Sequence, residues 1–261
     1  TASMSLRIGE PNYLPPGVEL EYYYVLVDAQ GDVHETAPIV FEYLDERIQW
    51  TKTQIGPLLL IHHSDLQSSL TIIRQVETAL GHITDLLLLE ATLPIRGVIY
   101  NSEEEAQGAL PLQSQTIDEA QVFSGFAFPS NNVFVGVGFR ALIIVHEAAH
   151  LLLNQAVGPY ALPLPAWLDE GFASYVQPHS TAYSGRSLSS RGLPLQAMTS
   201  LSGTPQTIPT FYQKSESVVA YLIEEFGEEP FQRLVGVLTQ GRTMESALEE
   251  TYGFGISGLE A

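Results

Sequence analysis

The feature that most constrains this chain is the pentapeptide HEAAH, residues 146–150, inside an almost wholly apolar run over residues 139–156. A run of this kind predicts a buried helix that ends at Gly158. Residues four apart on a helix project from one face, so the two imidazoles can hold one divalent cation, most often zinc. Polar side chains are costly in such a run unless they are paired or bind a metal. The pattern therefore predicts a metal site on a buried helix.

Glu147 lies directly after the first imidazole, where it can reach a metal-bound water and accept its proton. A catalytic zinc site commonly has three protein ligands and one water. The next acidic residues along the chain are Asp169 and Glu170, at the start of a helix expected over residues 166–176. By chemistry alone either carboxylate can be the third ligand. Both can also be acids that favour the first turn of a helix through its macrodipole.

HEAAH followed by WLDEGFASYV closely resembles the gluzincin metallopeptidases, in particular their peptidase MA-like and aminopeptidase N groups. Those proteins carry HExxH followed, at similar spacing, by W-L-[ND]-E-G-[FL]-A. The resemblance implies that His146, His150 and Glu170 bind one zinc ion per chain. It also implies that Glu147 is the general base and that Asp169 is only a neighbour of the site. The resemblance therefore implies hydrolysis of peptide bonds by a metal-bound water.

A second resemblance lies at residues 211–219, where the aminopeptidase-type family has a Tyr-x-Lys segment that supplies a tyrosine to stabilise the oxyanion. Tyr212 matches that tyrosine; an aromatic residue packed in the core at a helix start is the alternative. Aminopeptidases also carry a Gly-x-Met-Glu-Asn motif that holds the free amino group of the substrate. The sequence contains no such motif, which favours endopeptidase over aminopeptidase action.

The expected fold class is α+β. Tyrosine- and valine-rich segments over residues 18–27 and 33–41 flank the turn residues 28–32 and predict a β hairpin. We expect residues 1–46 to be this hairpin or the remnant of an N-terminal β domain, and residues 47–261 to be a gluzincin-type metallopeptidase domain. The resemblance implies a zincin-like, thermolysin-type domain with a small mixed sheet and a helical C-terminal half.

Within the second region the hydrophobic pattern predicts individual strands and helices. Strands are expected over residues 58–63, 95–100, 122–128 and 132–137. Further helices are expected over residues 65–89 (with Gly81 a potential break), 102–109, 211–226, 229–238 and 244–252. Residues 125–128 and 133–138 resemble the two strands before the active-site helix of thermolysin-like enzymes. The resemblance implies that residues 125–128 are an edge strand to which a peptide could add through main-chain hydrogen bonds.

His62 and His63 are further candidate ligands, at the end of the strand expected over residues 58–63. Adjacent residues on a strand point to opposite faces, so the two imidazoles cannot easily bind one metal together. We therefore expect structural or surface roles for both.

The chain has a formal net charge of −19 with 11 lysines and arginines, which argues against nucleic acids and anionic membranes as partners. It has no cysteine, which excludes disulfides, thiol catalysis and cysteine-based zinc sites. No apolar run reaches the roughly 18 to 20 residues of a membrane span, and no signal peptide is visible. The expected partner is a peptide or protein substrate. An extracellular or cell-surface location is what similar bacterial proteins imply.

Two other functional classes stay open at this point. One is a zinc hydrolase that acts on a non-peptide substrate. The other is a peptide-binding protein of low activity that keeps the peptidase fold and its metal. A damaged base or ligand would mark the second class, and the sequence shows none.

Overall fold

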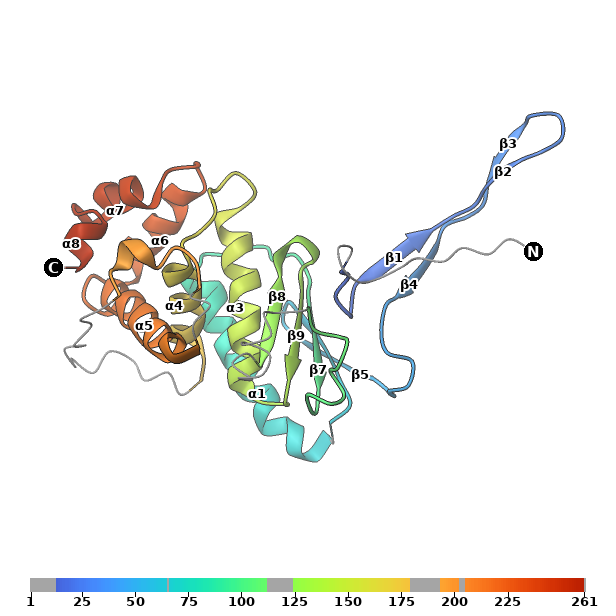
Figure 1. Ribbon diagram of the computed structural model, residues 1–261, viewed down its shortest axis with the longest axis horizontal. Helices are drawn as coiled ribbons and strands as arrows, with labels where there is room; N and C mark the ends of the chain where they lie inside the picture. Colours follow the sequence, from blue (N-terminus) through green and yellow to red (C-terminus); the bar gives the residue numbers. More distant parts are fainter. Residues whose placement is uncertain (1–12, 65, 112–123, 179–192, 202–204, 261) are drawn as a thin grey trace.

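A five-stranded mixed sheet lies at the centre of the protein, in the strand order β5-β6-β7-β9-β8 (Figure 1). The computed structural model describes residues 13–64, 66–111, 124–178, 193–201 and 205–260. The strands are β5 (Thr51–Ile55), β6 (Leu58–His62), β7 (Ile95–Tyr100), β8 (Gly125–Phe128) and β9 (Val133–Val137). The three middle strands are parallel, and each edge strand is antiparallel to its neighbour. β8 is therefore an edge strand, as the sequence predicts.

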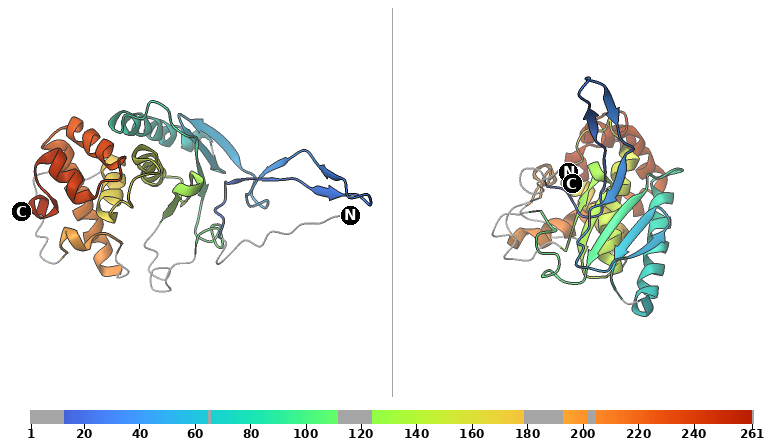
Figure 2. Two further views of the ribbon diagram at one scale, coloured as in Figure 1. Left: turned by 90° about the horizontal axis from the view of Figure 1, so that it is seen from above. Right: turned by 90° about the vertical axis from the view of Figure 1, so that its right-hand side faces the viewer.

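Helices cover one face of this sheet and form the C-terminal half of the molecule (Figure 2). The α-helices of the described residues are α1 (Leu66–Leu86), α3 (Ala141–Val157), α4 (Ala166–Val176), α5 (Ile208–Glu224), α6 (Glu228–Leu238), α7 (Met244–Tyr252) and α8 (Ile256–Glu260). Short 3-10 turns occur at η1 (Pro129–Asn131), η2 (Leu195–Ala197) and η3 (Pro205–Thr207). The helical face of the sheet shares one large core with α1, α3, α4, α5 and α6. The opposite face is covered by a smaller cluster that includes Trp50 and Ala106.

α3 packs against β8, β9, α1 and α4, and most of its residues are buried. Gly158 ends it with φ 71°, a value that favours glycine because no Cβ meets the backbone. An apolar run buried on nearly all sides explains why HEAAH lies within the core and not on a solvent-facing surface. α3 is therefore the element that positions the candidate site.

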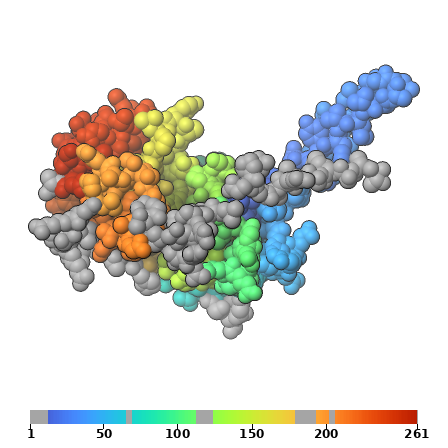
Figure 3. All heavy atoms as spheres, viewed as in Figure 1, coloured from blue at the N-terminus to red at the C-terminus, as the bar shows by residue number. Residues whose placement is uncertain are grey.

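A two-stranded β ribbon over residues 19–42 projects away from the sheet (Figures 1 and 3). β1 (Glu19–Tyr22) pairs with β4 (Ile39–Glu42), and farther out β2 (Val25–Val27) pairs with β3 (Val33–Glu35). At the tip, Asp28 Oδ1 accepts hydrogen bonds from the main-chain N–H groups of Gln30 and Asp32. The predicted hairpin is thus confirmed.

Ion pairs fasten the base of the ribbon to the sheet. Arg96 of β7 donates to Glu42 across 2.5 Å and lies 2.6 Å from Glu19. Lys52 of β5 lies 2.7 Å from Glu42. The boundary between residues 46 and 47 stays a prediction, and residues 1–12 lie outside the described part of the chain.

Several local predictions need correction. Residues 102–109 form successive turns and not a helix. There the Glu105 carboxylate accepts the N–H of Asn101, and Gly108 has φ 84°, which breaks a helical course. Gly81 does not interrupt α1, because flanking residues such as Val76 and Ile83 hold the helix in the core. α8 was not predicted from the sequence. Among the described residues, no helix combines the length and apolar character that crossing a membrane requires.

Candidate metal centre

α3 presents both imidazoles of HEAAH to the same cavity. The ring centroids of His146 and His150 lie 4.9 Å apart, nearly perpendicular to each other. Both rings are largely buried; 15% of the His146 side chain and 10% of the His150 side chain remain exposed. The four-residue spacing on a helix thus brings the two rings together, as predicted.

Glu170 reaches the same point from α4. Its Oε2 atom lies 3.3 Å from Nε2 of His146 and 3.6 Å from Nε2 of His150. One ligand atom from each of the three residues lies within 4.8 Å of the others. Oε2 is nevertheless buried and accepts no hydrogen bond from the described residues. Two ring nitrogens and one unsatisfied carboxylate oxygen therefore converge on one point.

Asp169 approaches the other side of the second imidazole. Its Oδ1 atom lies 2.9 Å from Nδ1 of His150. Nδ1 is therefore the ring nitrogen that pairs with Asp169, and Nε2 is the nitrogen that faces Glu170. Adjacent acids on α4 thus take different positions: Glu170 faces both rings, whereas Asp169 fixes the orientation of one of them.

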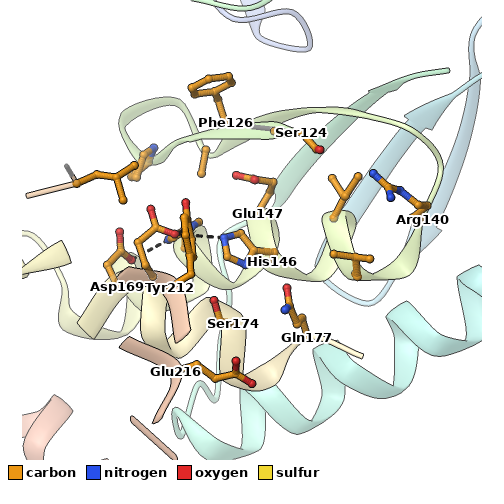
Figure 4. A pocket seen from close by; sticks show the side chains of 18 residues that line it. Ser124, Phe126, Arg140, His146, Glu147, Asp169, Ser174, Gln177, Tyr212 and Glu216 are labelled. Atoms are coloured by element: carbon orange, nitrogen blue, oxygen red, sulfur yellow. Dashed lines mark hydrogen bonds and ion pairs between the residues drawn. The ribbon is translucent and has the colours of Figure 1, made fainter. Parts of the chain in front are cut away.

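Glu147 lies between α3 and the edge strand β8 (Figure 4). A Cβ atom on Gly125 would be 2.6 Å from Oε1 of Glu147, so only glycine allows β8 to pass this close to the carboxylate. Burial raises the pKa of Glu147, although the positive charges of protonated His146 and His150 would lower it. The raised pKa makes this carboxylate a stronger base than a solvent-exposed glutamate.

Tyr212 enters the same cavity from the first turns of α5. A Cβ on Gly171 would be 2.4 Å from the main-chain oxygen of Ser215, so this glycine lets α4 and α5 pack very closely. The ring of Tyr212 is thereby held 6.1 Å from the ring of His146, measured between centroids. Burial, and after it the charges of Glu170 and Glu147, raises the pKa of Tyr212 far above its ordinary value. The phenol therefore keeps its proton and can act as a hydrogen-bond donor.

Comparison with protein families matches residues 77–261 to the Peptidase MA superfamily. This match covers more than half of the chain. The chain belongs to the Peptidase MA superfamily. A comparison with curated proteins finds no match.

The donor set of this Peptidase MA protein fits a zinc ion. Two imidazole nitrogens and one carboxylate oxygen are common zinc ligands, and three protein ligands leave a position for water or substrate. The structure also favours a cation at this point, because Oε2 of Glu170 is buried and has no hydrogen-bond donor among the described residues. Burying a carboxylate oxygen without a partner is costly. The contact between Asp169 and His150 is the kind of outer hydrogen bond that orients metal-binding histidines.

The His150 imidazole and the Glu170 carboxylate each favour the charged form of the other. Burial alone would raise the pKa of Glu170, but the neighbouring imidazoles His146 and His150 lower it strongly. Burial alone would lower the pKa of His150, but Asp169 and Glu170 raise it well above its ordinary value. In the absence of a cation, a proton on His150 therefore balances part of the negative charge. A bound divalent cation would take over that role and release the proton.

In this Peptidase MA protein the site opens into a cleft of about 640 Å³, lined by β8, α3, α4 and α5. Arg140, Ser174, Gln177 and Glu216 also line it, and sequence reasoning assigned no role to them. Arg140 carried a sequence signal, because it is a charged residue inside the apolar run over residues 139–156. Ser174 and Glu216 are polar residues on helices and Gln177 directly follows α4, and nothing in the sequence separates them from ordinary surface positions.

His62 and His63 do not join this group. The ring of His62 is fully buried, with Nε2 3.1 Å from Oγ1 of Thr53. Nε2 of His63 lies 2.9 Å from a carboxylate oxygen of Glu105. Their structural roles agree with the expectation that neighbouring strand residues face opposite ways.

Proposed function

We propose that the protein is a zinc-dependent metallopeptidase of the gluzincin type, with a thermolysin-like arrangement of its catalytic residues and endopeptidase action. The observation that supports this most strongly is the convergence of His146, His150 and Glu170, with Oε2 of Glu170 left unsatisfied. Membership of the Peptidase MA superfamily supports peptide bonds as the target. The missing amine-binding motif supports internal cleavage over aminopeptidase action.

In this proposal His146, His150 and Glu170 hold the zinc ion, and Asp169 keeps His150 in the tautomer that binds a metal. When bound, zinc supplies Lewis-acid polarisation of the attacking water and of the scissile carbonyl. Glu147 accepts the proton of the water and passes it to the leaving amine; its raised pKa suits both transfers. The hydroxyl of Tyr212 donates a hydrogen bond to the oxyanion as negative charge develops there.

The edge strand β8 would align the substrate. Its outer main-chain N–H and C=O groups have no neighbouring strand in the described sheet, so an extended peptide can pair with them. Gly125 brings this strand against Glu147, and the peptide would then lie across the mouth of the metal site. An extracellular or cell-surface setting is part of the same proposal and rests on the resemblance alone.

The test is hydrolysis of a library of internally quenched peptides by the zinc-loaded protein, with mass spectrometry of the products. Glu147→Gln is expected to lower the rate by about 10²- to 10⁴-fold while zinc content is retained. Glu250→Gln, at an exposed position on α7, is the matched control and should be as active as the wild type. Equal activity of Glu147→Gln and the wild type would overturn the role of Glu147. Hydrolysis of esters or other non-peptide substrates alone would overturn the peptidase assignment.

A further inference from the structure

Arg140 lies at one end of the cleft, directly before the first residue of α3. Its side chain is exposed, and Figure 4 shows it on the opposite side of His146 from Asp169. Among the described residues that line the cleft, it is the only lysine or arginine, whereas four lining residues are acidic. The cleft therefore has one cationic end, in a chain whose overall charge is strongly negative.

Helix energetics do not favour arginine at this position. Arg140 is the N-cap residue of α3, and its side chain makes no capping hydrogen bond. The N-terminus of a helix carries partial positive charge, so a cation there is unfavourable. Asn, Asp or Ser would cap the helix instead and stabilise it. Within the described residues no carboxylate forms an ion pair with Arg140. Local conflicts of this kind are expected where a residue serves function.

The distance from Arg140 to the metal site suits a short stretch of substrate. Arg140 precedes His146 by six residues, which corresponds to roughly 9 Å along a helix axis. An extended peptide advances about 3.3 Å per residue. For a peptide that runs alongside α3, the backbone of Arg140 is therefore level with the second or third residue from the scissile bond.

The direction of the edge strand shows which side of the scissile bond this is. The start of β8 is the end nearer Arg140: the main-chain oxygen of Ser124 accepts the N–H of Val137, three residues before Arg140. Antiparallel pairing is the more frequent arrangement of neighbouring strands. A peptide antiparallel to β8 places its C-terminal part at this end. Arg140 then faces residues that follow the scissile bond.

We propose that Arg140 is a specificity-determining residue that binds a substrate carboxylate about two or three residues after the scissile bond. This inference rests on the proposed peptidase function and names the class of substrate for that site. The carboxylate is either an acidic side chain or the C-terminal carboxylate of a short substrate, because a guanidinium pairs with both in the same bidentate way. A carboxylate there also offsets the repulsion between Arg140 and the positive end of α3.

The experiment compares kcat/KM for matched peptides with Glu, Gln or Lys at the second and third residues after the cleaved bond. One set is extended and amidated at its C-terminus; a second set ends at those residues with a free or an amidated C-terminus. The wild type is expected to prefer the carboxylate about tenfold, an effect that weakens as salt increases. In Arg140→Gln, peptides with and without the carboxylate should have about equal kcat/KM values. In Arg140→Glu, the preference should invert in favour of the Lys peptides. Arg242→Gln, at an exposed position between α6 and α7, should keep the wild-type ratio.

The two peptide sets distinguish the two sources of the carboxylate. A preference only in the extended set assigns an acidic side chain, and a preference only among free C-termini assigns the terminal carboxylate. An equal ratio in the wild type and Arg140→Gln, or no preference in the wild type, overturns the proposal.

Binding of the same peptides to Glu147→Gln protein, measured by fluorescence anisotropy, distinguishes this inference from the proposed function. If no peptide is cleaved but binding still depends on Arg140 and the carboxylate, the peptidase function fails and the role of Arg140 stands. If peptides are cleaved and neither rates nor binding depend on Arg140, the function stands and this inference fails.

Discussion

The β ribbon over residues 19–42 and the helix pair α3 and α4 are both rich in apolar residues, yet their environments are opposite. Val27 of the ribbon is 65% exposed, whereas Val145 of α3 is fully buried. Within the described residues each strand of the ribbon pairs with one other strand and the ribbon projects from the molecule, whereas α3 has partners on nearly every side. Apolar composition alone therefore does not decide whether a segment is buried; the number of elements packed against it does.

The same difference explains where chemistry can occur. The acidic residues in the outer part of the ribbon, Asp28, Asp32 and Glu35, are exposed to water, where charge is well solvated. Between α3 and α4, Glu147 and Glu170 are carboxylates in the core, and burial acts on the pKa of each. Only the second environment can hold a reactive group in a state that water alone would not favour. Four changes test this contrast.

The largest expected effect follows from removing a core side chain of α4, the helix that carries Glu170. Trp167 of α4 is fully buried, so Trp167→Ala should lower the free energy of unfolding by about 3–5 kcal/mol. Tyr23→Ala in the ribbon, where the side chain is 52% exposed, should change it by about 0.5 kcal/mol or less. Urea unfolding followed by circular dichroism measures both. Similar losses in the two variants would contradict the contrast.

The second effect concerns the residue that orients His150. Asp169→Asn removes the charge that stabilises the Nδ1 proton of His150, so zinc affinity should fall by about 10- to 100-fold. Asp28→Asn at the tip of the ribbon makes the same chemical change and should leave the affinity as in the wild type. Competition with a chromophoric chelator measures the dissociation constants. An unchanged affinity in Asp169→Asn would show that this contact does not support the metal site.

The third effect is a pH-dependent ion pair at the end of the helical half. Lys214 of α5 is buried and pairs with Glu260, whose other carboxylate oxygen accepts the N–H of Leu195 across 2.7 Å. Although burial alone would raise it, these contacts hold the pKa of Glu260 below its ordinary value of 4.5. The stabilisation is therefore present above that value and is lost as the pH falls through the lowered pKa.

Glu260→Gln should accordingly lower the free energy of unfolding by about 1 kcal/mol at pH 7, since the exposed carboxylate is screened by solvent. The difference from the wild type should shrink as the pH falls below 4.5. At the base of the ribbon, Glu19→Gln breaks a more exposed ion pair with Arg96. This substitution should change the free energy of unfolding by about 0.5 kcal/mol or less. Urea unfolding at a series of pH values tests this, and a difference that grows in acid would refute the assigned sign.

The smallest effect is expected from shortening the ribbon. Replacing residues 23–38 by Asn-Gly joins the paired residues Tyr22 and Ile39 through a two-residue turn. The free energy of unfolding should change by about 0.5 kcal/mol or less, because the removed side chains are mainly exposed. Zinc content and peptide hydrolysis should stay at wild-type levels. Loss of either would show that the ribbon belongs to the catalytic unit.

Much of the fold could be predicted because long apolar runs carry a clear period. The helices α3 and α4, the strands β6 and β7 and the hairpin of the ribbon all follow from local patterns and turn residues. Residues 102–109 were wrongly predicted as a helix because three consecutive glutamates resemble a helix start. One of them, Glu105, instead folds back onto Asn101 and His63, a contact between segments that a local pattern does not contain.

The candidate site could be predicted in its types of residue but not in its geometry. The chemistry of Asp169 and Glu170 is the same, and which of them faces both imidazoles depends on how α4 packs against α3. The close approach at Gly171 that brings Tyr212 to the site depends on α5, more than thirty residues farther along the chain. The position of Arg140 in the cleft likewise appears only once β8 and α3 are placed together.

The most direct test of the account is the zinc content of purified, metal-replete protein, determined by inductively coupled plasma mass spectrometry. We expect one zinc ion per chain in the wild type and in the protein with the shortened ribbon. We also expect loss of that zinc in His146→Ala and Glu170→Ala variants that remain folded by circular dichroism. Absence of zinc from the wild type, or full occupancy in both folded variants, would contradict the metal centre proposed between α3 and α4.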